Sequence, residues 1–357
     1  MSTSGLTEKL ATGSTRLVEY RGAQAIAAYS DARQEFAALR SGCGIYDLSW
    51  RAKIILTGSD RVRWLNGMIT NNVRDLASGR GIYAFLLNPQ GRILADQYAY
   101  NRGDYLLVDT DQSQLRKVLE IFDHYIISDD VEVTNATEKL TAVGLAGPKA
   151  RQVLQTAGLE IPPLEPIQTA DLSWQGVGVT VVRADNEIVE TFEIWLAPSN
   201  VSRLWDAVVK SGATPVGFEA LELMRIAAGI PRYGQDIRER DLPQETEQTR
   251  ALHFSKGCYV GQEIVERIRS RGSVHRKFTG FEISGPLPAP GDKIQLDGKD
   301  VGEITSAASL PGAQADLQVA LGYIRREVAQ PGKEFDIGSV KATERQLPFA
   351  EFVKTED

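Results

Sequence analysis

Three strand-like runs follow one another between residues 81 and 110. The segment GIYAFLLNPQGRILADQYAYNRGDYLLVDT is rich in Tyr, Leu, Ile and Val, and the turn-forming sequences NPQG and NRGD separate its runs. Strands joined by tight turns pair in antiparallel fashion, because a parallel pair needs a long crossover connection. The segment therefore predicts an antiparallel meander. Helix-like runs on both sides of it favour α+β layers over a doubly wound parallel sheet.

Helical spacing flanks this meander, and a second set of similar elements follows it. GSDRVRWLNGMITNNVRDL (residues 58–76) predicts a helix capped by Ser59 or Asp60, and QSQLRKVLEIFDHYI (112–126) predicts another. From residue 141 the chain again reads as a strand, a Gly-Pro turn and a helix, followed by more strands and two helices. The order of elements echoes the first half and predicts two related α+β subdomains.

After Gly272 the pattern changes to short alternating runs punctuated by Gly and Pro, with no helix-like segment. This pattern predicts an antiparallel barrel or sandwich of roughly 80 residues. The sequence thus predicts an α+β protein of three domains. Their expected bounds are residues 1–140, 141–273 and 274–357.

Charge and composition limit the classes of function. The net charge is −7, so nucleic acid and anionic membranes are not expected partners, and no run approaches the ~20 apolar residues of a spanning helix. The N-terminal residues lack the apolar core of a signal peptide, and we expect a cytoplasmic protein. The chain has two cysteines and three histidines, with no CxxC pair and no two histidines four residues apart. We therefore expect neither a disulfide framework nor a permanent metal centre.

The stretch SKGCYVGQEIVERIRSRG, residues 255–272, holds one of the two cysteines. A nearby cation favours the thiolate, which attacks electrophiles or ligates soft metals. Lys256 stands two residues before Cys258 and would project to the same side of an extended segment. Gly257 and Gly261 would allow a sharp turn. Cys258 is thus a candidate catalytic thiol; the alternative is a small buried side chain in a tight loop.

The same stretch continues as a predicted helix that Gln262 opens and Gly272 ends. Arginines in its last turns suit the negative end of the helix dipole. With the following His275, Arg276 and Lys277 they form a basic run, a candidate seat for a carboxylate or phosphate. The alternative is a solvated basic face.

Two further charged residues are candidates for a site. Asp96 follows a turn in a strand-like run, where its carboxylate could face a cleft or lie on an ordinary surface. Arg225 lies in an apolar helical segment, where a guanidinium without a partner would be costly to bury. It needs a ligand or a salt bridge to Glu222 or Glu219.

The octet KGCYVGQE resembles the signature of the YgfZ-type folate-binding proteins, relatives of a mitochondrial iron–sulfur maturation factor. Residues 44–96 are similar to the N-terminal portion of that family and of the glycine-cleavage T-protein aminomethyltransferases, and LMRIAAGIPRYGQDI (223–237) resembles their folate-contacting segment. The resemblance runs from about Gly42 into the C-terminal barrel.

This resemblance implies ferredoxin-like α+β subdomains around a central channel that holds tetrahydrofolate, with a C-terminal β-barrel. It implies that Asp96 lies near the reactive nitrogens of the folate and that further residues contact the cofactor. These are Tyr83, Arg225, Lys256 and Gln262, with Cys258 at the channel mouth. This chain departs from T-proteins in having Ala95 beside Asp96, where they have two acids, and Val189 where they have a pterin-binding glutamate.

Three functions remain open. The favoured one is a tetrahydrofolate-binding protein that assists iron–sulfur cluster assembly or repair, with Cys258 as its functional thiol and iron–sulfur clients or assembly proteins as partners. The second is a folate-dependent aminomethyltransferase of the T-protein type, in which Asp96 manages protonation. The third is a cysteine hydrolase with His253 or His275 as base.

Overall fold

The structure is a computed structural model that describes residues 7, 10–11, 15–272, 274–312 and 314–349. The chain divides into two compact units. Residues 1–84 and 95–221 form the first unit, and residues 85–94 and 222–357 form the second.

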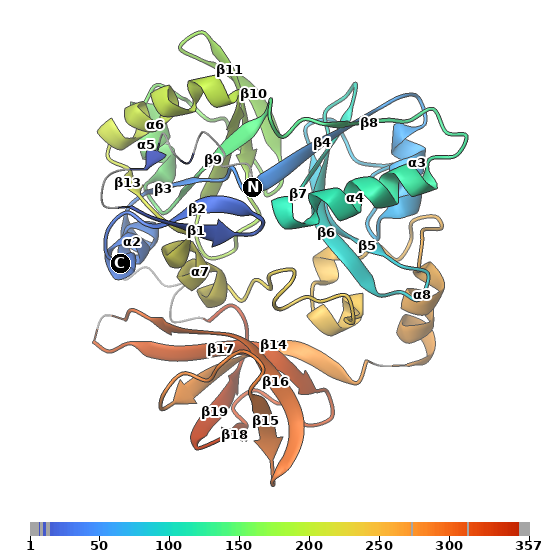
Figure 1. Ribbon diagram of the computed structural model, residues 1–357, viewed down its shortest axis with the longest axis vertical. Helices are drawn as coiled ribbons and strands as arrows, with labels where there is room; N and C mark the ends of the chain where they lie inside the picture. The colour runs from blue at the N-terminus through green and yellow to red at the C-terminus, as the bar shows by residue number, and fades with distance from the viewer. Residues whose placement is uncertain (1–6, 8–9, 12–14, 273, 313, 350–357) are drawn as a thin grey trace. The chain divides into compact units, whose positions relative to one another are not determined.

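A five-stranded sheet with the order β5-β6-β7-β4-β8 contains the predicted meander. Its strands are β4 (Arg51–Thr57), β5 (Gly81–Leu87), β6 (Ile93–Asn101), β7 (Leu106–Asp111) and β8 (Glu132–Asn135). Helix α4 (Gln112–Tyr125) lies along this sheet (Figure 1) and buries Val118 and Phe122. The Phe122 ring meets Trp64 of helix α3 (Arg61–Met68) edge-on, with 5.1 Å between the ring centroids. The three consecutive strands of the meander and the helix after it are confirmed.

Helix α3 is shorter than the sequence predicts. It ends at Met68, and Ile69 is already extended. The side chain of Asn72 accepts hydrogen bonds from the backbone N–H groups of Arg74 and Asp75, at 3.0 and 3.3 Å. Such local bonds compete with helical ones, so the helical spacing of residues 69–76 does not produce a helix.

The second sheet draws its strands from distant parts of the chain. Its order is β10-β11-β12-β9-β3-β13, and every neighbouring pair is antiparallel except β3 with β13. The strands are β3 (Gly44–Asp47), β9 (Thr141–Ala146), β10 (Thr169–Trp174), β11 (Val177–Arg183), β12 (Thr191–Leu196) and β13 (Thr214–Pro215). Strand β3 precedes the first sheet in sequence but joins the second, so the second sheet contains residues from before and after the predicted boundary at residue 140. The boundaries at residues 140 and 273 therefore stay a proposal.

Helices cover this sheet and share an apolar core with it. Helices α5 (Ala150–Thr156) and α6 (Val201–Lys210) lie side by side over it (Figure 1), and α6 buries Leu204 and Val208. Trp174 is completely buried in the same core, and its indole N–H donates to the carbonyl of Ala157 at 2.9 Å. Helix α2 (Ala32–Ser41) and the hairpin of β1 (Arg16–Tyr20) and β2 (Ala23–Ala28) complete the unit.

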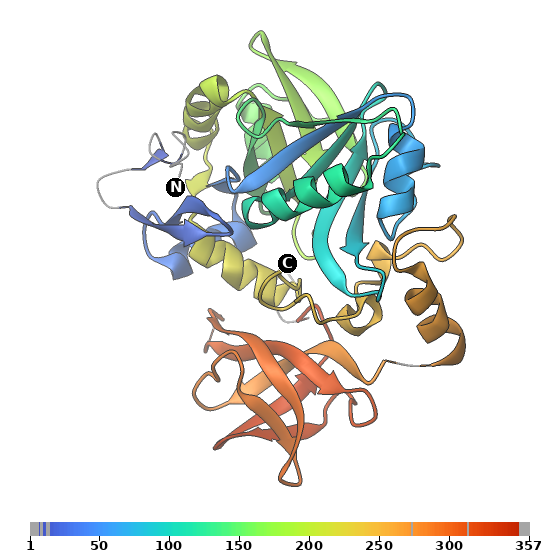
Figure 2. The same cartoon turned by 45° about the vertical axis from the view of Figure 1, so that its right-hand side comes forward.

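The second unit contains a closed six-stranded barrel (Figure 2) with the order β14-β17-β16-β15-β18-β19. The strands are β14 (Arg276–Ser284), β15 (Lys293–Leu296), β16 (Lys299–Leu310), β17 (Leu317–Arg325), β18 (Glu334–Ile337) and β19 (Val340–Arg345). Phe281 and Phe335 pack edge-on inside it. The predicted α+β class and the C-terminal antiparallel barrel are confirmed.

Two helices complete the regular structure. Helix α7 (Phe218–Ala227) crosses the boundary between the units, and α8 (Gln262–Arg271) comes after it. The 3₁₀ turn η1 (Pro198–Asn200) precedes α6, and the turns η2 (Pro243–Thr246) and η3 (Thr249–Ala251) lie between α7 and α8. Among the described residues, no helix combines the length and apolarity that crossing a membrane requires.

Candidate functional site

Asp96 lies where strands β6 and β7 separate. The two strands pair from Tyr98 opposite Asp109 to Asn101 opposite Leu106. At Asp96 a side chain replaces the strand partner, because the backbone N–H of Asp96 donates to Gln114 Oε1 at 3.0 Å. The divergence of β6 and β7 therefore fixes the position of Asp96.

Three contacts fix the Asp96 side chain and its backbone carbonyl. Tyr83 Oη donates to Oδ2 at 2.8 Å, and Gln114 Nε2 donates to Oδ1 at 2.8 Å. Thr110 Oγ1 donates to the carbonyl oxygen of Asp96 at 2.8 Å. The carboxyl is therefore held in one orientation while the residue stays partly exposed. The structure brings Tyr83 and Asp96 together, as the resemblance implies.

The surroundings of Asp96 raise the pKa of its carboxyl. Burial is the main cause, and the negative charge of Asp111 adds to it. The hydrogen bonds from Gln114 and Tyr83 and the charge of Arg51 act in the opposite direction without cancelling these effects. A carboxyl with a raised pKa can exchange a proton nearer to neutral pH, which is a property of catalytic acids and bases.

A ladder of buried ion pairs on β4 and β7 adjoins Asp96. Arg51 lies opposite Asp111, and Lys53 lies opposite Asp109. Lys53 Nζ is 2.6 Å from Asp109 Oδ2, and Arg51 reaches both acids, with Nε 2.7 Å from Asp109 Oδ1 and Nη1 2.5 Å from Asp111 Oδ1. Arg21 adds a further contact to Asp111 at 3.1 Å. The ladder fixes the charges that act on Asp96.

Aromatic rings lie around the same face of β6. Ring centroids are 5.1 Å apart for Tyr83 and Tyr98, and 4.9 Å apart for Tyr100 and Trp195. Lys53 Nζ lies 5.1 Å from the centre of the Trp195 ring. Tyr98 is partly exposed, whereas the other three rings are buried. The site thus combines a carboxyl with one accessible aromatic face.

The sequence analysis missed most of these supporting residues. Gln114, Thr110 and the ion-pair ladder were not among its candidates. A usable signal was present, because Arg51 and Lys53 on one strand and Asp109 and Asp111 on another stand two residues apart, which places each pair on one face of its strand. Four such charges in otherwise apolar strands predict cross-strand ion pairs.

Arg225 is buried and satisfied within the second unit. Its Nε and Nη2 donate to Glu222 at 3.0 and 2.9 Å, and its Nη1 donates to Asp236 at 2.8 Å. Nη1 also donates to the carbonyl of Ile230, and Nη2 donates to Ser306 Oγ. All five N–H donors are engaged. The predicted salt bridge to Glu222 is confirmed, and a folate contact would require one of these bonds to be exchanged.

The cysteine loop places its lysine and its thiol in different environments. Cys258 is exposed, whereas Lys256 is buried with Nζ 5.0 Å from the centre of the Tyr259 ring. Gln262 turns back on the loop, and its Oε1 accepts from the backbone N–H of Tyr259 at 3.2 Å. The predicted opening of α8 at Gln262 is confirmed, and its side chain holds the loop. Among the two cysteines, Cys43 is the buried one, and burial raises the pKa of its thiol to about 12.

Gly261 controls the geometry of this loop, and we expect Gly261→Ala to disturb it. Its φ of +82° is strained for other residues, and an added Cβ would lie 2.5 Å from the carbonyl oxygen of Asn88. Strain and clash together should lower the free energy of unfolding by about 2 kcal/mol. Gly257→Ala is the matched control, since no heavy atom lies within 4 Å of its added Cβ. Chemical denaturation of both variants measures the difference, and equal losses would contradict the assignment.

The hydrolase hypothesis needs a base beside the thiol. Across the described ranges, no hydrogen bond or ion pair joins Cys258 to His253 or His275. His253 Nδ1 instead accepts from the backbone N–H of Ser255 at 3.3 Å. Within the same ranges, no group of three or more His, Cys, Asp or Glu residues is arranged to hold a metal ion.

Comparisons with known proteins agree on one family. Residues 7–256 match the GCVT N-terminal domain, and residues 276–350 match the glycine cleavage T-protein C-terminal barrel domain. The chain belongs to the glycine cleavage T-protein family. The residues that match the barrel domain contain the six strands of the closed barrel, β14 to β19.

Individual relatives extend over nearly the whole chain. An aminomethyltransferase of Rubrobacter xylanophilus is 30% identical over 316 residues, which cover 87% of this chain and 84% of the relative. One from Herpetosiphon aurantiacus is 28% identical over 350 residues, or 94% of each chain. The crystal structure of the glycine cleavage system aminomethyltransferase T from Bartonella henselae covers 99% of this chain and 98% of its own, with a TM-score of 0.86 at 20% identity. The last similarity establishes the fold.

Proposed function

We propose that the protein is a folate-dependent aminomethyltransferase of the T-protein type, with Asp96 as its proton-transfer group. The observation that carries this proposal is the Asp96 carboxyl, held by Tyr83 and Gln114, partly exposed and raised in pKa. The aminomethyltransferases among its relatives support the transferase hypothesis over the iron–sulfur one that the sequence motif favours.

The residues around Asp96 fit a reduced folate. A pterin presents N–H groups and a flat ring, and Asp96 and Tyr98 lie two residues apart on one face of β6, both partly exposed. When bound, the folate supplies a nitrogen that carries the one-carbon group. Asp96 would accept or donate a proton at a carboxyl oxygen, while Tyr83 and Gln114 keep its orientation. Burial is the main cause of its raised pKa, Asp111 adds to it and Arg51 opposes it.

A second candidate is a folate-binding protein of the YgfZ type that assists iron–sulfur cluster assembly or repair. One observation favours it: Cys258 is exposed in the loop that carries the octet, where a client or a cluster could reach the thiol. This second proposal includes a functional link between Cys258 and folate binding. It also includes contacts of Lys256, Arg225 and Gln262 with the cofactor.

Turnover of an aminomethyl-lipoyl substrate with tetrahydrofolate separates the two candidates. The transferase proposal expects turnover by the wild type and by Cys258→Ala, because the thiol takes no part. Calorimetry with tetrahydrofolate should give heat of binding for both proteins. Folate binding without turnover, together with Cys258-dependent recovery of an iron–sulfur enzyme, would favour the second candidate. No binding of any folate would rule out both.

A further inference from the structure

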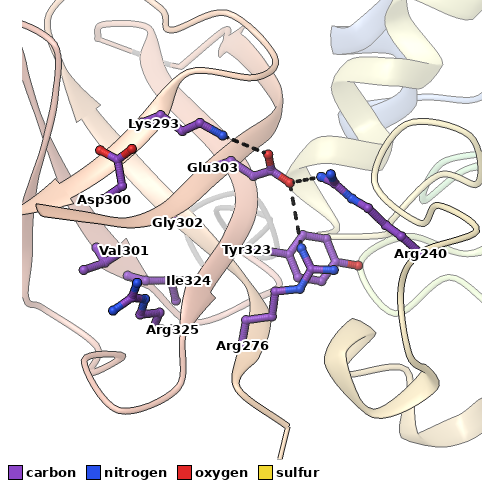
Figure 3. A pocket seen from close by; sticks show the side chains of 10 residues that line it. All are labelled: Arg240, Arg276, Lys293, Asp300, Val301, Gly302, Glu303, Tyr323, Ile324 and Arg325. Carbon is purple, nitrogen blue, oxygen red and sulfur yellow. Dashed lines mark hydrogen bonds and ion pairs between the residues drawn. The ribbon is translucent and has the colours of Figure 1, made fainter.

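The barrel carries a hollow that no part of the proposed chemistry uses. It has a volume of about 440 Å³ and lies within the second unit, where strands β14 to β17 and a preceding loop supply its walls. We name it the barrel hollow. Its charged or polar lining residues are Arg240, Arg276, Lys293, Asp300, Glu303, Tyr323 and Arg325 (Figure 3).

One carboxylate at the barrel hollow attracts four cations. Glu303 Oε1 lies 2.6 Å from Arg238 and 3.8 Å from Arg276, and it also pairs with Arg240. Its second oxygen lies 3.4 Å from Lys293 Nζ. Figure 3 shows Arg240, Arg276 and Lys293 directed at Glu303, while Arg325 lies apart beside Val301. Asp241 also pairs with Arg238, Arg240 and Arg276, and Glu245 pairs with Arg276, so among the described residues three carboxylates face four cations and one positive charge is in excess.

The charges are layered, with carboxylates beneath and cations above. The side chains of Glu303 and Asp241, which share these arginines, are 15% and 0% exposed. Those of Arg240, Lys293 and Arg325 are 58%, 54% and 58% exposed. Asp300 is the one exposed acid in the lining, and its carboxylate accepts from Gln295. A ligand therefore meets a cationic surface on a chain whose net charge is −7.

Strand register adds a second indication of an anion site. Arg276 of β14 lies directly opposite Arg325 of β17. Like charges in this position destabilise a sheet. Arg276 is partly neutralised by Asp241, at 2.5 Å, and by Glu245, at 3.1 Å, but the only ion pair of Arg325 among the described residues is a long one of 3.8 Å to exposed Glu327. An anion between them would relieve this repulsion.

Tyr323 offers a donor at the same place. Its side chain lines the barrel hollow, and its hydroxyl is buried without a hydrogen-bond partner among the described residues. The guanidinium groups of Arg276 and Arg238 lie 4.7 and 5.7 Å from the centre of its ring. A buried hydroxyl without a partner is costly, and a ligand oxygen would satisfy it.

We propose that the barrel hollow binds a small organic or inorganic anion with two or more acidic groups, as phosphate or carboxylate. Guanidinium groups match both kinds of oxygen pair, and cations on separate sides of the hollow suit a multiply charged ligand. Its volume lies within the range of small-molecule sites. This binding is separate from the Asp96 chemistry and does not depend on the proposed function.

Calorimetric titration of the full chain with pyrophosphate and with citrate tests the site. We expect at least one of them to bind to the wild type, and Arg240→Ala/Arg325→Ala to weaken that binding at least about tenfold, since each exposed charged contact contributes severalfold. Lys341→Ala/Arg345→Ala is the matched control, because it removes the same charge from exposed positions elsewhere on the barrel. If pyrophosphate binds and citrate does not, the acidic groups of the natural ligand are phosphates. If citrate binds and pyrophosphate does not, they are carboxylates.

Glu303→Gln tests whether the cations that surround Glu303 are the ones that bind the anion. It frees the cations that Glu303 holds, so the anion should bind about tenfold tighter. Thermal unfolding of each variant checks that it is folded. Weaker or unchanged binding to Glu303→Gln, equal losses in the two double variants, or no binding of either anion to the wild type would each overturn the proposal.

Discussion

Asp96→Asn is expected to lower the turnover number for aminomethyl transfer by about a hundredfold or more, with the fold intact. Asparagine keeps the size of the side chain but cannot take up a proton, and a positioned acid–base group contributes roughly 10²–10⁴ to rate. Steady-state kinetics measures the loss. Asp171→Asn is the control, since the Asp171 side chain is largely exposed in the same unit and, among the described residues, bonds only to Arg102 and Thr180. Full activity in Asp96→Asn would remove Asp96 from the mechanism.

Asp96→Asn and Asp171→Asn are expected to change the free energy of unfolding in opposite directions at neutral pH. Because the pKa of Asp96 is raised by burial and by Asp111, the folded chain holds this proton above pH 3.8, where the unfolded chain releases it. Stability therefore falls as pH rises through the raised pKa, and Asp96→Asn should be more stable than wild type at neutral pH. Below about pH 3.8 this advantage should vanish.

For Asp171, partial burial raises the pKa, but hydrogen bonds from Thr180 and Arg102 outweigh it and lower the pKa. This acid stabilises the fold above its ordinary pKa of 3.8 and loses that contribution as pH falls through the lowered value. Asp171→Asn should then be less stable than wild type at neutral pH. Denaturant unfolding between pH 3 and 8 measures both differences, and the same sign for the two variants would contradict the assignment.

Lys53→Met is expected to lower the free energy of unfolding by about 3 kcal/mol. The lysine is completely buried, and its removal leaves part of the charge of Asp109 uncompensated in the interior. Methionine fills a similar volume, so the loss reflects the charge and not a cavity. Lys341→Met, at an exposed pair with Asp336, should leave the unfolding midpoint nearly unchanged. A comparably small shift for Lys53→Met would show that the ladder does not stabilise the fold.

Local patterns in the sequence predicted much of the fold. The meander of residues 81–111 and the barrel strands follow from alternation and turn residues, which act over short distances. Strand β3 was not predicted, because its four residues pair with strands that lie about 100 and about 170 positions later. The end of α3 depends on side-chain bonds of Asn72, which periodicity does not register.

The candidate site was predicted less completely. The proximity of Tyr83 and Asp96 came from the family resemblance, and the roles of Gln114 and Asp111 required the divergence of β6 and β7. Of the two partners predicted for Arg225, Glu222 is the one found, at a local i,i+3 spacing, whereas Glu219 pairs with Arg16. The side chains of Lys256 and Cys258 differ in burial, which a rule for extended segments does not capture.

The position of β3 has a consequence for biosynthesis. This strand leaves the ribosome early but lies between β9 and β13, so it must wait until residues beyond 215 have been translated before both of its edges are paired. At roughly 5–20 residues per second, that interval lasts about ten seconds or more. During this time the nascent segment exposes unpaired strand edges, which makes it a natural client for chaperones that act on growing chains.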